Sequence, residues 1–171
     1  SPQMMLALLR QLVYEVGVAQ ADIAIGDTLC YFPNQYYDVL HDEFPDVRYL
    51  DYEGKFGRTA VRQSSVPLYW SCDPSVGYQD YVPVSYAQAD YIISMANLKS
   101  HTMAGVTLSA KNHYGSLVRW PGQSGYYHLH GDLPSEVTGM GHYRNLVDLM
   151  GHAHLGGKTL LYFIDGLYAG E

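Results

Sequence analysis

The sequence predicts an α/β fold: a mostly parallel or mixed sheet flanked by helices, in a Rossmann-like three-layer arrangement. Two observations support this prediction. Helix-like and strand-like segments alternate along residues 1–51, and the strand-like segments are short, continuous apolar runs. Such runs are typical of parallel strands that are covered on both faces. A length of 171 residues and a hydrophobic content of 47% suit one domain over residues 1–171.

The first third of the chain contains two helix–strand pairs. Pro2 suits the first turn of a helix and Gly17 can end it, and apolar residues recur at helical spacing between them. Residues 21–26 form an apolar run that is expected to be a strand. A second helix is predicted over residues 33–44, and a second strand over residues 47–51.

The later elements are more widely spaced. Residues 66–70 are strand-like within a stretch rich in Gly and Pro, and residues 91–95 are expected to be a central strand. After a long loop, a helix is predicted over residues 142–155 and a final strand over residues 159–164. Only a few residues follow this last strand. We therefore expect an oligomeric partner or further chain segments to complete the sheet.

Composition excludes several classes of protein. The chain has 10 basic and 17 acidic side chains, and this net charge of −7 argues against a nucleic-acid partner. No apolar run is long enough to predict a membrane span. Cys30 and Cys72 form no C-x-x-C motif, so no iron–sulfur cluster is expected in this chain. A disulfide between them and two separate thiols both stay open.

The densest polar stretch, residues 97–115, directly follows the predicted central strand. In open α/β sheets, ligands bind beyond the carboxyl ends of the strands. Lys99 and His101 are two residues apart and point to one side of an extended chain. Gly105 allows close backbone approach, and the turn after it is expected to open a helix whose free N–H groups attract an anion.

That helix would place Thr107 and Lys111 on one face, four residues apart. Two lysines, a histidine and a helix N-terminus together predict a cradle for an anionic ligand such as a carboxylate or phosphate. The lysines would neutralise its charge, His101 would carry a proton or bind the ligand, and Asn112 would orient it. In the alternative interpretation, the lysines are solvated and Asn112 caps a turn. The candidate ligand or catalytic residues of this stretch are Lys99, Ser100, His101, Gly105, Thr107, Lys111 and Asn112.

Histidines support a second hypothesis, a divalent metal site. His128 and His130 form an H-x-H motif, and in extended chain both imidazoles would point to one side. His101 or Asp132 would supply a third ligand. In the alternative interpretation, the two histidines are a surface pair packed among tyrosines.

Asp27 and Asp165 follow the ends of two predicted strands. Each either joins the site, as an acid, base or metal ligand, or caps the turn that follows it. The sequence contains no G-x-G-x-x-G, Walker A, G-x-S-x-G or H-E-x-x-H motif. Whether the chain is an enzyme therefore stays open.

Three segments resemble the central motif of the domain of unknown function 362 family: YIISMANLKSH (91–101), GVT (105–107) and KNHYG (111–115). Two further segments, IGD (25–27) and IDG (164–166), resemble strand ends of the same family, so the resemblance covers most of the chain. The departures from the commonest form of the motif are Ser94 for Asn, Ala96 for Pro and Asn97 for Lys. The last departure removes one basic group near the candidate site.

The resemblance implies flanking segments, because family members usually begin with a further strand and continue beyond the Asp-Gly. We therefore expect this chain to be a fragment, as its start at Ser1 also indicates. Some members look exported with twin-arginine signals, which favours an exported or periplasmic location. Others carry ferredoxin-type cysteine clusters, so a redox role here would need a separate iron–sulfur partner. A second alternative to the ligand site is a non-catalytic binding or assembly domain, because the chain has 17 tyrosines and tyrosine is favoured at protein interfaces.

Overall fold

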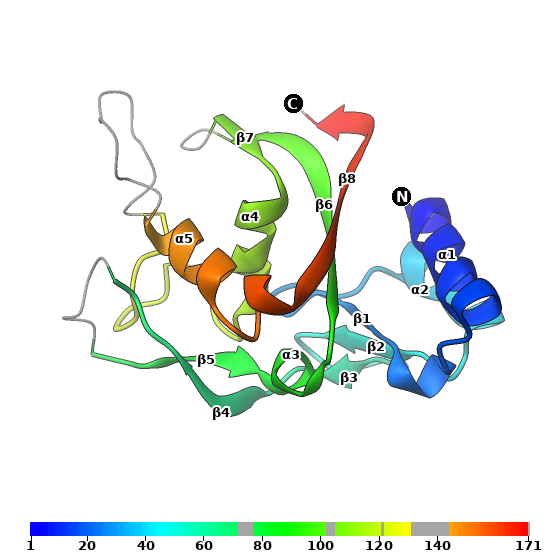
Figure 1. Cartoon of the computed structure of the whole chain (residues 1–171), viewed down its shortest axis with the longest axis horizontal. Coiled ribbons are helices and arrows are strands. Elements are labelled where there is room, and N and C mark those ends of the chain that lie inside the picture. Colours follow the sequence, from blue (N-terminus) through cyan, green and yellow to red (C-terminus); the bar gives the residue numbers. More distant parts are fainter. Residues whose placement is uncertain (72–76, 102–104, 121, 131–143, 171) are drawn as a thin grey trace. The chain divides into compact units, whose positions relative to one another are not determined.

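The computed structural model describes residues 1–71, 77–101, 105–120, 122–130 and 144–170 (Figure 1). The chain has the predicted α/β class, with helices beside parallel, antiparallel and mixed sheets. It divides into two compact units, Ser1–Val61 and Arg62–Glu171. The single domain expected over residues 1–171 stays a prediction. Cys72 lies outside the described residues, so its pairing with Cys30 also stays open.

The first unit has a parallel sheet in the order β1-β2-β3. Its elements are α1 (Pro2–Arg10), a π-helical turn (Gln11–Val16), β1 (Ala24–Gly26), α2 (Asn34–Glu43), β2 (Arg48–Asp51) and β3 (Thr59–Ala60). The second predicted helix and strand are confirmed to within one residue at each end. Gly17 ends the first helix with a φ of 84°, which glycine adopts without strain. The strand β1 is shorter than predicted, because residues 20–22 form a 3-10 turn.

Apolar faces of the two helices and the sheet meet in the core of the first unit. The buried members are Leu9, Phe32, Leu40, Phe44, Val47 and Tyr49. Each such side chain contributes about 1.5–3 kcal/mol when it leaves water. The helical spacing of the apolar residues therefore decides which face of each helix turns inward.

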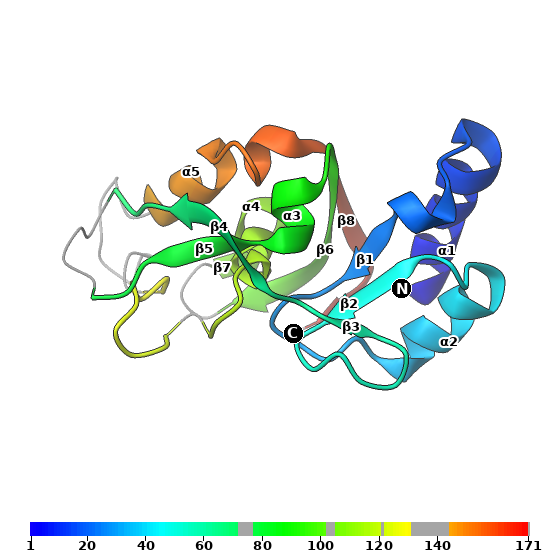
Figure 2. The same cartoon turned by 90° about the horizontal axis from the view of Figure 1, so that it is seen from below.

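The second unit contains two sheets. Its elements are β4 (Gln63–Leu68), β5 (Asp80–Pro83), α3 (Val84–Gln88), β6 (Ile92–His101), β7 (Gly105–Thr107), α4 (Ser109–Asn112), a 3-10 turn (His113–Ser116), α5 (Arg144–Gly151) and β8 (Thr159–Gly170). The strands β4 and β5 form an antiparallel pair (Figure 2). The mixed sheet has the order β7-β6-β8, in which β6 is antiparallel to β7 and parallel to β8.

The segment after Gly105 differs from the prediction. Gly105 has a φ of 69° and begins β7, which runs back along β6. Val106 and Thr107 are in a strand, as suits their β-branched side chains, so Thr107 shares no helical face with Lys111. The helix α4 starts only at Ser109 and has 4 residues. It is too short to provide the helix N-terminus that was expected to attract an anion.

The remaining predicted elements of this unit are confirmed with shifted ends. The predicted central strand and final strand extend further than expected, as β6 and β8. The strand predicted at residues 66–70 is β4 and begins three residues earlier. The helix predicted over residues 142–155 is α5, which is described from Arg144 and ends at Gly151, because residues 153–155 form a turn.

A histidine and a lysine between α5 and β8 cap the end of α3. His154 Nδ1 lies 3.2 Å from the carbonyl of Ala87, and Lys158 Nζ donates to the carbonyls of Ala87 at 3.0 Å and Ala89 at 2.5 Å. Cations at the C-terminal end of a helix satisfy its last carbonyl groups. These two residues therefore have a structural role. None of the helices in the described ranges is long and apolar enough to span a bilayer.

Candidate functional site

The β6–β7 hairpin positions two of the predicted site residues. Lys99 pairs with Thr107 across the hairpin, and His101 pairs with Gly105. Side chains two apart on a strand lie on one face, so Lys99 and His101 share a face and Ser100 lies on the other. Residues directly opposite each other in an antiparallel pair also share a face. Thr107 is therefore on the same side as Lys99.

The short helix α4 positions Lys111. Its neighbour Asn112 donates from Nδ2 to Ser94 Oγ at 3.0 Å and to the carbonyl of Met95 at 3.3 Å. Both acceptors are on β6, so this amide ties α4 to the central strand. Because its N–H groups are used in this way, Asn112 fixes the position of Lys111 and does not present a free donor to a ligand.

Four basic side chains from three segments meet beside the hairpin, and we call Lys99, His101, Lys111 and His130 the basic cluster. Lys111 Nζ lies 3.5 Å from His130 Nε2 and 5.0 Å from the centroid of the Tyr114 ring. The rings of His101 and His130 are parallel within 2°, with centroids 5.5 Å apart. The structure thus brings together Lys99, His101 and Lys111, as predicted, and adds His130 to them.

Burial and nearby positive charges lower the pKa of three members of the basic cluster, Lys111, His101 and His130. Burial, and then the charge of Lys99, lowers the pKa of Lys111. Burial also lowers the pKa of His101, with smaller contributions from Lys111 and Lys99. The pKa of His130 falls for the same reasons, burial first and the charge of Lys111 next. Both imidazoles are therefore neutral at pH 7.

Neither lysine of the basic cluster has a carboxylate partner within the described ranges. The ion pairs found there are Arg10–Glu43, Lys55–Glu53 and Arg119–Asp80. Lys111 is half-buried, and its contacts are an imidazole nitrogen and an aromatic ring. This arrangement leaves its charge uncompensated, which costs free energy in a partly desolvated position.

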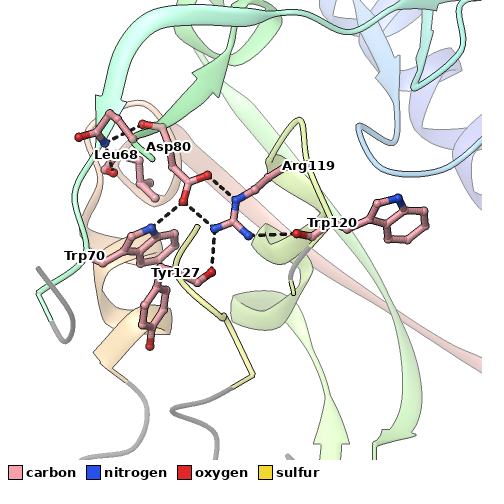
Figure 3. A network of polar contacts seen from close by, with 7 residues as sticks. Leu68, Trp70, Asp80, Arg119, Trp120 and Tyr127 are labelled. Atoms are coloured by element: carbon pink, nitrogen blue, oxygen red, sulfur yellow. Dashed lines mark hydrogen bonds and ion pairs between the residues drawn. The ribbon is translucent and has the colours of Figure 1, made fainter. Parts of the chain in front are cut away.

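A buried ion pair holds the segment that carries His130 (Figure 3). Asp80 accepts hydrogen bonds from Arg119 Nε at 2.5 Å, from Arg119 Nη2 at 2.6 Å and from Trp70 Nε1 at 2.7 Å. Arg119 Nη2 also donates to the carbonyl of Tyr127 at 3.0 Å. The ion pair therefore links β5 to the backbone three residues before His130. Sequence reasoning missed Asp80 and Arg119, because nothing in their spacing indicates that they pair.

A second network fixes the same segment one residue from His130. The carbonyl of Leu129 accepts a hydrogen bond from Tyr114 Oη at 3.0 Å and another from Asn145 Nδ2. Leu129 and Asn145 are fully buried. Side chains that are locked from several elements hold a site in one geometry, so His130 is preorganised beside Lys111.

The H-x-H motif is not extended as expected, because residues 129 and 130 form a turn. The rings of His128 and His130 are 6.1 Å apart, with planes inclined at 70°, and His128 is exposed. No three His, Cys, Asp or Glu side chains come together as metal ligands in the part of the chain that the structure describes. Asp132 lies outside that part. The metal hypothesis stays a prediction.

The structure places the other candidates individually. Asp27, in the first unit, accepts hydrogen bonds from the backbone of Leu29 at 2.8 Å and Cys30 at 3.3 Å, which is the geometry of a turn cap. Asp165 is buried on β8, in register with Asn97 of β6. It lies within that strand and does not begin a turn.

Thr107 is 8% exposed, and its Oγ1 is buried without a hydrogen-bond partner. A hydroxyl in that state costs about 1–3 kcal/mol relative to a satisfied one. Because Thr107 shares a face of the hairpin with Lys99, its hydroxyl is a further polar group on the side of the basic cluster.

The fold and the site define an α/β protein with a basic cluster where the central strand turns back. The family model for the domain of unknown function 362 matches residues 6–171. The chain belongs to this family, as its central motif predicts. Comparison with curated proteins and with solved structures gives no match.

Proposed function

We propose that the second unit binds a small anionic ligand, such as a carboxylate or a phosphate, through the basic cluster. One observation carries this proposal. Lys111 is half-buried, and its ammonium group lies beside an imidazole and a phenol ring, with no carboxylate partner among the described residues. Buried charges are normally paired, because removing them from water is costly. An anion bound at Lys111 would supply the missing partner.

Each member of the basic cluster has a distinct role in this proposal. Lys111 and Lys99 neutralise the charge of the ligand. His101 and His130 are neutral imidazoles in this proposal; the Nε2 atom of His130 faces Lys111, which leaves its other ring nitrogen as an N–H donor. If the bound group reacts, His101 is the proton carrier, because it lies on the strand that also carries Lys99.

The proposal is tested by replacing Lys111 with Met, which keeps much of the apolar stem and removes the charge. We expect Lys111→Met to weaken the binding of sulfate at least tenfold in isothermal titration calorimetry at pH 7. The melting temperature of this variant should fall little, because the positive charge of Lys111 is repelled by that of Lys99. Lys55→Met is the matched control, because Lys55 is an exposed lysine of the first unit and its loss removes the same charge. Unchanged sulfate affinity in Lys111→Met would contradict the proposal, as would wild-type protein that binds no anion.

A second candidate function, assembly with further copies of this chain, is favoured by exposed aromatic side chains in the second unit. Tyr69 is 71% exposed, Tyr78 is 59% exposed and Trp120 is 62% exposed. Tyr78 is held firmly, because its N–H donates to the carbonyl of Gly125 at 2.9 Å and its ring lies 5.2 Å from that of Tyr126. Rigid aromatic side chains are favoured at interfaces. We expect self-association in sedimentation velocity that weakens in Tyr78→Ser. A monomer at all concentrations would argue against it.

A further inference from the structure

We propose that the ligand of the basic cluster is a doubly charged tetrahedral oxyanion of the phosphate or sulfate type. This inference rests on the proposed function, since it names the class of anion that the same site takes. Three independent features of the cluster support it: the number of its charges, the number of elements that contribute polar groups, and an unsatisfied hydroxyl beside it.

The charges of the cluster add up to two. Lys99 and Lys111 each carry one positive charge, and neither is in an ion pair within the described ranges. The groups beside Lys111 are His130 and the ring of Tyr114, and both lysines act electrostatically on His101. A singly charged ligand would leave one ammonium group uncompensated, whereas a doubly charged ligand matches both.

The geometry shows why the two imidazoles do not add to this count. An ammonium group can only donate, so the 3.5 Å contact requires His130 Nε2 to accept from Lys111 Nζ. A ring that accepts at this nitrogen is neutral. The ring of His101 lies parallel to it at 5.5 Å, close to both lysines, and the lowered pKa of each histidine agrees with a neutral pair. The site therefore presents two charges at pH 7, and not four.

The polar groups of the site come from several elements. Lys99 and His101 are on β6, Lys111 is on α4, and His130 is on a separate segment. A carboxylate has two oxygens in one plane, whereas a tetrahedral oxyanion directs three or four oxygens to different sides. Lysine is also a common phosphate ligand that acts as a point charge. Groups spread over three segments therefore suit the tetrahedral shape.

The hydroxyl of Thr107 adds an observation that is independent of charge. It lies on the hairpin face that carries Lys99, is nine-tenths buried and has no partner. Protein atoms cover this hydroxyl, so it would donate to an oxygen-rich ligand only once the side chains over it move aside on binding, and the new hydrogen bond would then remove the cost of leaving it unsatisfied.

Pairs of probes that differ in one property test this inference by isothermal titration calorimetry of the whole chain at pH 7.5. Sulfate and methyl sulfate share a tetrahedral centre but carry two charges and one charge, respectively. We expect sulfate to bind at least tenfold more tightly than methyl sulfate or acetate. The preference should be lost in Lys99→Met and kept in Lys55→Met. Lys99 is exposed, so the preference should also weaken with added salt.

The outcomes separate this inference from the proposed function. Equal affinities for sulfate, methyl sulfate and acetate would overturn the doubly charged ligand and leave anion binding intact. Absence of binding for all of these probes would overturn both. Inorganic phosphate and methyl phosphate then distinguish the source of the group. Tighter binding of methyl phosphate identifies a phosphate monoester, and tighter binding of inorganic phosphate identifies the free ion.

Discussion

Replacing Asp80 by Asn tests whether the buried ion pair supports the second unit. Asp80 is 2% exposed and accepts three hydrogen bonds, two from Arg119 and one from Trp70. The substitution keeps the shape of the side chain but removes its charge. Arg119 is 3% exposed and would lose the carboxylate with which it forms this buried ion pair.

The expected cost is large compared with the stability of a typical domain. Breaking a buried ion pair from one side costs about 3–5 kcal/mol, whereas a domain is stable by about 5–15 kcal/mol. Replacing both partners, as in Asp80→Leu with Arg119→Met, removes both charges and should cost much less than the two single changes added together. What remains is the loss of donors to the carbonyls of Trp120 and Tyr127 and of the acceptor for Trp70 Nε1, at about 1–3 kcal/mol each.

Urea unfolding followed by tryptophan fluorescence is the appropriate assay. The two tryptophans of the chain, Trp70 and Trp120, are both in the second unit, so the signal reports that unit alone. The exposed Asp90 of the same unit provides the matched control, Asp90→Asn. If Asp80→Asn lies within about 1 kcal/mol of that control, or if the two changes are additive in the double variant, the ion pair does not carry the stability assigned to it.

Two further predictions concern buried polar groups of the second unit. Burial lowers the pKa of His113 to about 4, below the value of 6.5 that holds in the unfolded chain. Between these two pKa values the folded state binds fewer protons than the unfolded state. The free energy of unfolding is therefore unaffected by His113 above pH 6.5 and falls by about 3 kcal/mol as the pH falls to 4. His113→Gln should flatten urea midpoints measured between these pH values, and an equally steep profile would argue against the assignment. Thr107→Val removes a buried hydroxyl without a partner and should raise the melting temperature of the free protein while weakening sulfate binding. A lower melting temperature would contradict the first expectation. Unchanged sulfate affinity would contradict the second.

The sequence predicted well those elements whose apolar residues follow one period. The helix at residues 33–44 and the strand at residues 47–51 match α2 and β2, because their apolar residues turn toward one core. The segment after Gly105 was misjudged. Its composition suits a helix start, but a φ of 69° at Gly105 turns the chain back onto β6. Pairing with a neighbouring strand, which local sequence does not reveal, decided the outcome.

The sequence predicted only part of the candidate site, because local spacing places some of its residues and long-range contacts place the others. Lys99 and His101 lie two apart on one strand, so their shared face follows from sequence spacing alone. The segment that carries His130 is held by Arg119 and Asn145, which donate to the carbonyls of Tyr127 and Leu129. Such contacts join residues that are distant in the chain. The H-x-H motif indicated His130 as a metal ligand, which stays a prediction, and did not indicate its position beside Lys111.

The Asp80–Arg119 pair has a consequence for anyone trimming this chain. A shortened version that starts at β6 would retain all four members of the basic cluster, and its composition would look complete. It would lack Trp70 and Asp80. Arg119, which donates to the carbonyl of Tyr127 and so positions the segment that carries His130, would then lose its buried ion pair. A portion that keeps the basic cluster in this geometry must therefore begin upstream of Trp70, well before the residues through which we propose that the anion binds.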